Sequence, residues 1–349
     1  MAVTSSGQIS IQDIMTELGV SGTSSLNDAD FRALINKSSG ATMSLSEWYG
    51  ASGETVLSGN NLQIRTSDYI SSGGVLRLSS GSYIYSDNTG VAGLIIDTPN
   101  CTVINEGYIM GRGGDSNTSV AQTGGSSVNG GAGGPAINVT ASGVTITNSS
   151  GAFIGGGGGA GGSGWGGLGG GGAGGGQSGP AWDGFTNLGG TPGNKGATYP
   201  SNRQINFADG GGSEGGGGGA HEIYQTSKST SWQRYSAGNG GGRIFGSSHI
   251  NIGHDGKYRN GANNLVDSDG GDGGSAFANT SPNAQTAVSS DGTNNVLQHG
   301  AGGGGGWGQA GGNGDVGITG VSGNGGAAGA AITGTGRTLS NSGTIYGST

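Results

Sequence analysis

The chain has 349 residues, of which 88 are glycine, whereas an ordinary globular domain contains only about 7% glycine. Only 30% of the residues are hydrophobic and 10% are charged, a composition that suits neither a conventional enzyme core nor a charge-rich disordered chain. The formal net charge of −8, with 13 Lys and Arg residues that form no run, disfavours binding to nucleic-acid phosphates.

Three further classes are disfavoured by simple counts. Six prolines and the lack of a strict Gly-X-Y period exclude collagen, and the single Cys101 cannot form an intrachain disulfide. The N-terminus has no basic region followed by an apolar stretch, and no run of about 20 apolar residues occurs. We therefore expect a chain that is made in a cytoplasm, stays soluble there and does not insert into a membrane.

Residues 1–52 are predicted to form a small helical module. Ser10 can cap a helix that Gly19 ends, because apolar residues follow at helical spacing at Ile11, Ile14, Met15 and Leu18. A second helix is predicted to start after Ser25 or Asn27 and to carry Phe31, Leu34 and Ile35. Residues 43–50 resemble residues 9–13 in sequence.

Short strands are predicted from residue 53 onward. Apolar and β-branched segments occur at residues 56–57, 62–64, 75–78, 83–85, 94–97 and 102–104, and turn-forming residues separate them. Such close and even spacing favours a β-solenoid or a small sandwich.

An internal repeat follows these strands. Residues 94–111, 136–155 and 331–347 share an apolar pair, a polar turn and a strand in which Thr precedes an apolar residue. Asn, Ser or Glu, and Gly follow, and each copy closes with an apolar segment and Gly. Asn105, Asn148 and Asn341 occupy the same turn position, where a side-chain amide can bond the backbone. Each copy is predicted to be one β-rung, and a degenerate fourth copy is expected at residues 243–261.

Glycine runs are joined to these rungs. In residues 155–176, 17 of 22 residues are glycine, and further runs occupy residues 210–219 and 300–326. Polyglycine can form an extended threefold helix with a rise of about 3.1 Å per residue and no internal hydrogen bonds. Several such helices can bond laterally, since glycine has no Cβ to hold neighbours apart. The alternative is that these runs are disordered linkers.

The predicted fold class is therefore mainly irregular and β, with four parts. A helical module at residues 1–52 precedes a β-rung region at 53–150. A body of polyglycine type II helices with inserted loops follows at 151–330, and a last β-rung occupies 331–349. We expect the body to carry most of the glycine and the rungs to carry most of the apolar core.

Recognition side chains gather in three interruptions of the glycine runs, at residues 180–209, 220–236 and 254–269. Aromatic residues and Arg dominate binding hot spots because they bury a large area with few rotatable bonds. The candidate receptor-binding residues are Trp182, Phe185, Tyr199, Tyr224, Trp232, Arg234, Tyr235 and Tyr258. The alternative is that these rings only cap the edges of the glycine layers, and Trp165 and Trp307 are expected to be structural lids.

No catalytic or metal-binding set is evident. Asp267 begins a calcium-like tract, but the Glu that an EF-hand needs eleven residues later is Ala278. The four histidines lack zinc-ligand spacing. A β-solenoid could still place Asp87, Asp97 or Glu106 on one face for glycan hydrolysis. We expect no enzymatic activity, no metal and no cofactor.

Two resemblances suggest a biological setting. The segments SGQISIQDIMTELG, SLNDADFRALINKSSG and MSLSEWYG resemble the N-terminal segment of many tailed-phage virion proteins. The interrupted glycine runs of about residues 111–330 resemble the receptor-binding adhesins at the tips of T-even-like long tail fibres, in which specificity loops interrupt a sandwich of polyglycine helices.

These resemblances imply a virion protein, assembled in the host cytoplasm, that joins other virion proteins through residues 1–52 and binds a bacterial surface protein or glycan. A purely structural role, as a capsid decoration, collar or tail component, is the alternative. The receptor, the position on the particle and the oligomeric state, including a homo-oligomer, are left open by the sequence.

Overall fold

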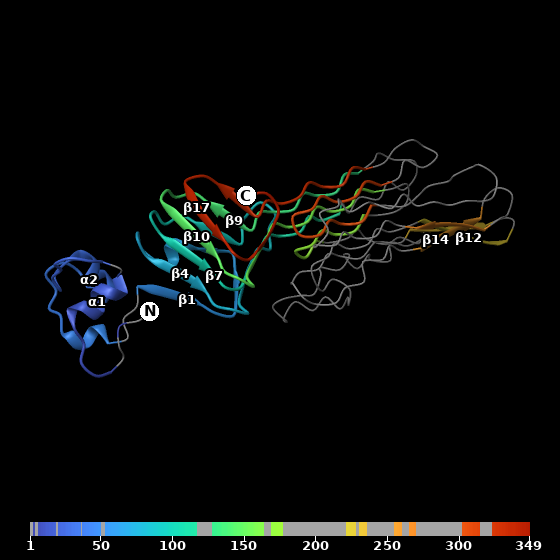
Figure 1. Cartoon of the computed structure of the whole chain (residues 1–349). Helices are drawn as coiled ribbons and strands as arrows, with labels where there is room; N and C mark the ends of the chain where they lie inside the picture. Colours follow the sequence, from blue (N-terminus) through green and yellow to red (C-terminus); the bar gives the residue numbers. More distant parts are fainter. Residues whose placement is uncertain are drawn as a thin grey trace.

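The computed structural model describes residues 3, 6–18, 20–35, 37–49, 53–116, 128–163, 169–176, 302–314 and 323–349, together with the backbone of four strands between residues 221 and 269. Figure 1 shows a helical module at the N-terminal end, then a stack of strands, then glycine-rich segments that run away from the stack. The described part of the chain contains no helix that is both long and apolar enough to cross a membrane.

The helical module contains α1 (Ile11–Leu18), α2 (Ala29–Leu34) and the 3-10 helix η1 (Leu45–Trp48). The predicted cap of α1 is confirmed, because the Asp13 amide donates to Ser10 Oγ at 3.2 Å and the Ser10 amide donates to Asp13 Oδ2 at 2.7 Å. Ser44 and Glu47 form the same reciprocal cap on η1. These short elements enclose a small core of their own, made by Val3, Ile14, Met15, Phe31 and Trp48.

Three sheets of parallel strands form the stack. The first has the order β1 (Glu54–Leu57), β4 (Val75–Leu78), β7 (Thr102–Asn105), β10 (Val144–Asn148) and β17 (Arg337–Asn341). The second contains β2 (Asn60–Leu62), β5 (Tyr83–Tyr85), β8 (Tyr108–Met110), β11 (Phe153–Gly155) and β18 (Thr344–Tyr346), and the third contains β3 (Ile64–Arg65), β6 (Leu94–Ile96), β9 (Ile137–Val139) and β16 (Ile332–Gly334). Because successive strands enter successive sheets, each turn of the chain adds one strand to each sheet.

The predicted strand at residues 62–64 is wrong. Gln63 has a positive φ of 45° and forms the corner between β2 and β3, so its two neighbours belong to different sheets. Three residues cannot continue one strand through this backbone conformation, which lies outside the β region.

The three predicted repeats lie in register with one another. Asn105, Asn148 and Asn341 are aligned across β7, β10 and β17. Asn105 Nδ2 donates to Asn148 Oδ1 at 2.8 Å, and Asn148 Nδ2 donates to Asn341 Oδ1 at 2.7 Å. The apolar side chains two residues before these asparagines in β7 and β10 lie on the same inward face. Inside the stack, residues such as Leu76, Ile146 and Ile154 are buried.

Glycine-rich segments leave the stack at one corner and return to it. Residues 111–116 continue β8 and residues 128–135 lead back into β9, while residues 156–163 continue β11 and residues 323–330 lead into β16. Together with residues 169–176, 302–307 and 309–314, these segments lie side by side (Figure 1). We call these seven segments the glycine bundle.

Residues 156–163 occupy the middle of the glycine bundle and donate hydrogen bonds with a period of three. Gly157 N, Ala160 N and Ser163 N donate to Gly134 O, Gly131 O and Val128 O in one neighbouring segment. The next positions, Gly158 and Gly161, donate to Ala173 and Gly170 in a second segment. The remaining positions, Gly159 and Gly162, donate to Gln309 and Gly312 in a third. Each third of the backbone therefore faces a different neighbour.

The carbonyl groups of residues 156–163 follow the same rule toward the other three segments. Gly329, Gly326 and Gly323 donate to the carbonyls of residues 157, 160 and 163. Gly305 and Gly302 donate to those of residues 159 and 162, and Gly114 donates to that of residue 158. Added Cβ atoms would collide with neighbouring carbonyl oxygens, at 1.9 Å for Gly157 and 1.8 Å for Gly161. Glycine is thus required here by close backbone approach.

Figure 1 shows a separate sheet at the opposite end of the molecule from α1 and α2. Its order is β13 (Thr230–Tyr235), β12 (His221–Ser227), β14 (Asp255–Arg259) and β15 (Leu265–Asp269). The prediction of a fourth β-rung at residues 243–261 is wrong for its described part, because β14 pairs with β12 and β15 and not with the stack.

Candidate functional site

The sheet of β12–β15 brings together five of the eight predicted receptor-binding positions. Tyr224 is the register partner of Trp232, and Arg234, two positions further along β13, is the partner of Glu222. Tyr235 is paired with His221, while Tyr258 on β14 is paired with Ile223. Directly paired positions are the contacting units of a sheet, so the backbone alone places these residue types close together. The other three candidates, Trp182, Phe185 and Tyr199, lie outside the described residues.

Sequence reasoning missed a column of stacked rings on the second sheet. Tyr83 and Tyr108 stack with ring centroids 4.8 Å apart and planes at 14°, and Phe153 continues the column at 5.3 Å and 2°. Tyr346 follows at 6.5 Å. Because these rings cover one another's faces, their stacking stabilises the sheet and leaves few faces for a sugar ring. An alignment of the repeats could have found Tyr108 and Phe153, which open the closing apolar segment three and five residues after the repeat asparagine.

Trp307 joins the glycine bundle to the strand stack. Its side chain is fully buried and belongs to one cluster with Tyr85, Met110 and Ala173. Tyr85 and Met110 come from the stack, whereas Ala173 and Trp307 come from the bundle. Trp307 is therefore a structural residue, as predicted, while Trp165 lies outside the described residues.

Arg112 fixes the base of the glycine bundle. The residue is only 4% exposed, and its Nη1 donates to Gly113 O at 3.1 Å and also to Gly175 O. Its Nη2 donates to Asp115 Oδ1 at 2.8 Å, which supplies the opposite charge that a buried guanidinium needs. The arrangement satisfies carbonyls of two glycine segments and offers a ligand little access.

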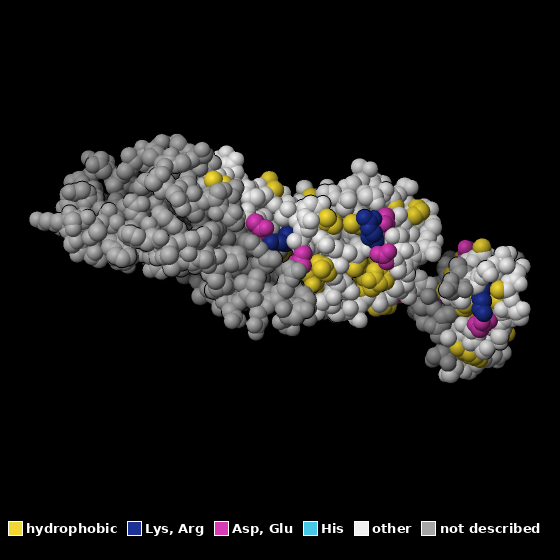
Figure 2. Space-filling model, turned by 180° about the vertical axis from the view of Figure 1, so that it is seen from behind, with side chains coloured by type: hydrophobic (Ala, Val, Ile, Leu, Met, Phe, Trp, Pro, Cys, Tyr) yellow, Lys and Arg dark blue, Asp and Glu magenta, His cyan; other side chains and the backbone are white. Residues whose placement is uncertain are grey.

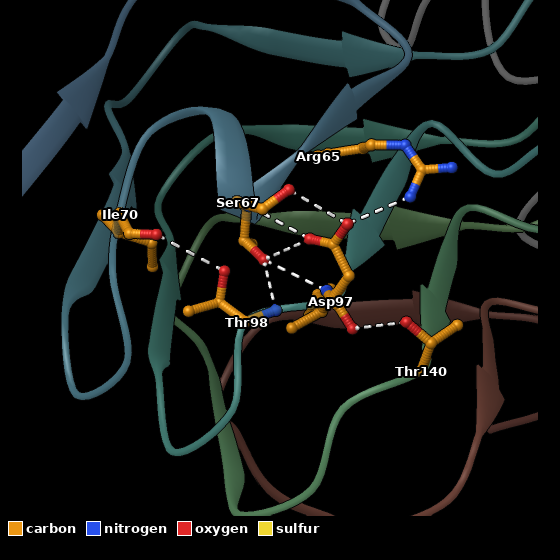
Figure 3. A network of polar contacts seen from close by, with 8 residues as sticks. Arg65, Ser67, Ile70, Asp97, Thr98 and Thr140 are labelled. Atoms are coloured by element: carbon orange, nitrogen blue, oxygen red, sulfur yellow. Dashed lines mark hydrogen bonds and ion pairs between the residues drawn. The ribbon is translucent and has the colours of Figure 1, made fainter.

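Asp97 is the centre of a polar network at the edge of the third sheet (Figure 3). Ser67 N and Oγ donate to its two carboxylate oxygens at 3.0 Å each, and Arg65 Nη1 donates at 3.0 Å. Desolvation by itself would raise the pKa of Asp97, but the hydrogen bonds from Ser67, Arg65 and Thr66 together lower the pKa below its ordinary value of 3.8. Asp97 thus stays ionised and holds a turn in place.

Glu106, like Asp97, forms an ion pair with an arginine. Arg77 forms ion pairs with both Glu54 and Glu106, and its hydrogen bond to Glu54 is the main reason why its pKa is raised. On the face of the molecule drawn in Figure 2, charged side chains of opposite sign lie next to each other among largely uncharged atoms. Among the described residues, no group of three or more His, Cys, Asp or Glu side chains could hold a metal ion.

Comparisons with known proteins add little to this picture. No protein-family model and no curated protein matches the chain. The chain is similar to a solved structure described as the crystal structure of the gp37-gp38 adhesin tip complex of the bacteriophage S16 long tail fiber, with 17% identity, coverage of 99% of both chains and a TM-score of 0.38. A likeness at this level does not establish a common fold or a common function.

Proposed function

We propose that the chain is a tail-fibre or tail-tip adhesin of a tailed phage that binds the bacterial surface. The observation that carries the proposal is the position of the side-chain-rich sheet β12–β15 relative to the glycine bundle and the helical module (Figure 1). A bundle joined by backbone hydrogen bonds offers a ligand few side chains, so recognition has to come from the segments that interrupt it. The resemblance of the N-terminal segment to virion proteins supplies the phage setting.

We further propose that the glycine bundle consists of polyglycine type II helices and that the strand stack is a β-solenoid. The three-residue period of the hydrogen bonds from residues 156–163 supports the first point, since a threefold helix directs successive amides to three different neighbours. The entry of successive strands into three parallel sheets supports the second. Hydrogen bonds to neighbours on several sides fix the position of each segment, which suits an exposed body that has to present a binding surface.

We propose residues 1–52 as the attachment module, followed by rungs at 53–150, the body at 151–330 and a final rung at 331–349. The module has its own buried core, and Ile11, Leu45 and Tyr49 are exposed on it. Deleting residues 1–52 should leave a soluble body that is absent from purified particles. Normal incorporation of this truncated chain would contradict the proposal, and a chain that carries Ile11→Ser and Leu45→Ser should show the same defect without a deletion.

The binding role has its own test. Replacing Trp232 and Tyr235 by Ala should reduce adsorption to host cells while particle assembly continues, with a loss of about 2 kcal/mol or more for each true anchor. Tyr69→Ala is the matched control, because this exposed aromatic residue lies in the strand stack. Replacement of residues 180–209, 220–236 and 254–269 without any effect on adsorption would leave the structural virion protein as the better account.

We propose that the role is non-enzymatic. Two of the three acids considered for glycan hydrolysis, Asp97 and Glu106, are each held by an arginine, Arg65 and Arg77 respectively. General acid catalysis needs a carboxyl group whose pKa is raised, whereas the pKa of Asp97 is lowered. Purified protein should therefore release no sugar from host surface polysaccharide, and any such release would refute this part of the proposal.

A further inference from the structure

Three Asn-Gly dipeptides lie in the glycine bundle, at Asn129, Asn313 and Asn324. All three asparagine residues are exposed, so their carboxamides are reachable by water. An asparagine that precedes glycine is unusually reactive, because the following residue has no side chain to hinder the approach of its backbone nitrogen to the carboxamide carbon. These residues are therefore the positions at which spontaneous deamidation of the bundle would be expected.

The reaction is self-contained apart from water. The backbone nitrogen of the glycine loses its proton to base and bonds to Cγ of the asparagine, while the bond from Cγ to the side-chain nitrogen breaks and ammonia leaves. Water then opens the five-membered imide at either carbonyl and gives aspartate or isoaspartate. The attacking atom is thus the amide nitrogen of the following glycine, which has to be free of other bonds.

In the glycine bundle each of these attacking nitrogens already donates a hydrogen bond. Gly130 N donates to Asn324 O at 2.8 Å, and Gly314 N donates to Gly323 O at 2.9 Å. Gly325 N donates to Asn313 Oδ1 at 2.8 Å, so the side chain of one dipeptide protects the nitrogen of another. Asn129 Oδ1 in turn accepts from Asn324 N at 2.8 Å. Asn129 is far from the other two dipeptides in the sequence, yet hydrogen bonds connect all three.

We propose that Asn129, Asn313 and Asn324 are deamidation sites whose modification requires the glycine bundle to open. The product matters because isoaspartate places an additional carbon atom in the backbone. An additional backbone atom disrupts the three-residue hydrogen-bond period on which every neighbouring segment depends. A bundle that has opened and formed isoaspartate therefore cannot close in its original register, and this damage is permanent, whereas an aspartate product keeps the original backbone. This inference depends on the hydrogen bonds and not on the adhesin role.

The test compares the full chain folded and unfolded in denaturant, both incubated at the same mildly alkaline pH. Peptide mass spectrometry quantifies aspartate and isoaspartate at the three sites. Reaction in the folded chain should be slower by at least about tenfold, since it needs a local opening. Equal rates in the folded and unfolded chains would overturn the proposal.

Two substitutions that keep the bundle glycines intact make the test specific. Asn313→Ala removes the acceptor of Gly325 N and should accelerate deamidation at Asn324 while Asn129 stays slow. Asn129→Ala is the matched control, because it removes a bond of the same length to Asn324 N, which is not the attacking atom. An unchanged rate at Asn324 in the Asn313→Ala chain, or equal acceleration in both chains, would refute the assigned protection.

Discussion

A single methyl group in the middle of the glycine bundle should be highly destabilising. In Gly157→Ala the new Cβ would lie 1.9 Å from Arg112 O and 2.4 Å from Arg112 C. Ordinary contact requires the segments to separate by about 1.5 Å or more. This movement breaks the bonds from Gly114 N to Gly158 O and from Gly111 N to Gly155 O, each worth about 1 kcal/mol. With about 1–3 kcal/mol for overpacking, the free energy of unfolding should fall by about 3–5 kcal/mol, and Gly157→Val should be worse.

Urea unfolding and amide hydrogen exchange would measure this effect. Gly53→Ala is the matched control, because its Cβ would meet only Leu34 Cδ1 at an ordinary 3.6 Å. Amides of residues 156–163 should exchange slowly in the unmodified chain and in the control, and faster in Gly157→Ala. The reasoning fails if both variants unfold at the same urea concentration and these amides exchange rapidly in the unmodified chain.

Three further predictions concern the strand stack and its joint with the bundle. Folding lowers the pKa of Asp97 below its ordinary value of 3.8, so its contribution to stability is present above that value and is lost as the pH falls through the folded pKa. Acid titration of the Asp97→Asn chain should lack this loss. Asn148→Ala removes the acceptor of the buried Asn105 Nδ2 and the donor to Asn341 Oδ1, and should cost about 2–3 kcal/mol in urea unfolding. Asn341→Ala, at the exposed end of the column, should cost less, and equal costs would contradict the ladder. Trp307→Ala removes a fully buried ring and should lower the calorimetric melting temperature by an amount that corresponds to about 3–5 kcal/mol.

The sequence predicted local features well where a short signal determines them. The cap at Ser10 needs only an acid three residues later. The repeat asparagines can be recognised because each has the same spacing from its apolar neighbours. Gln63 gave no such signal, since glutamine is not a residue that favours a positive φ. A three-sided stack needs its corners, so the arrangement of the strands could not be derived without them.

The joint between stack and bundle was also beyond local reasoning. Trp307 was predicted to be a lid, but its partners Tyr85 and Met110 come from more than 190 residues earlier in the chain. The column of Tyr83, Tyr108 and Phe153 depends in the same way on which strands become neighbours. For the candidate site, the residue types could be predicted from the sequence. The pairing of Tyr224 with Trp232 could not, because it depends on the register of the sheet.

The central position of residues 156–163 has a consequence for the order in which the protein folds. The six neighbouring segments of the glycine bundle that bond to them begin as early as residue 111 and end as late as residue 330. A nascent chain that has been translated to residue 300 still lacks three of these six neighbours, so the amides and carbonyls that await them remain exposed to water. Contacts of such long sequence separation slow folding because the connecting chain must first be ordered. The glycine bundle therefore closes late, only once residues 323–330 have been made, and β16 completes its sheet immediately afterwards.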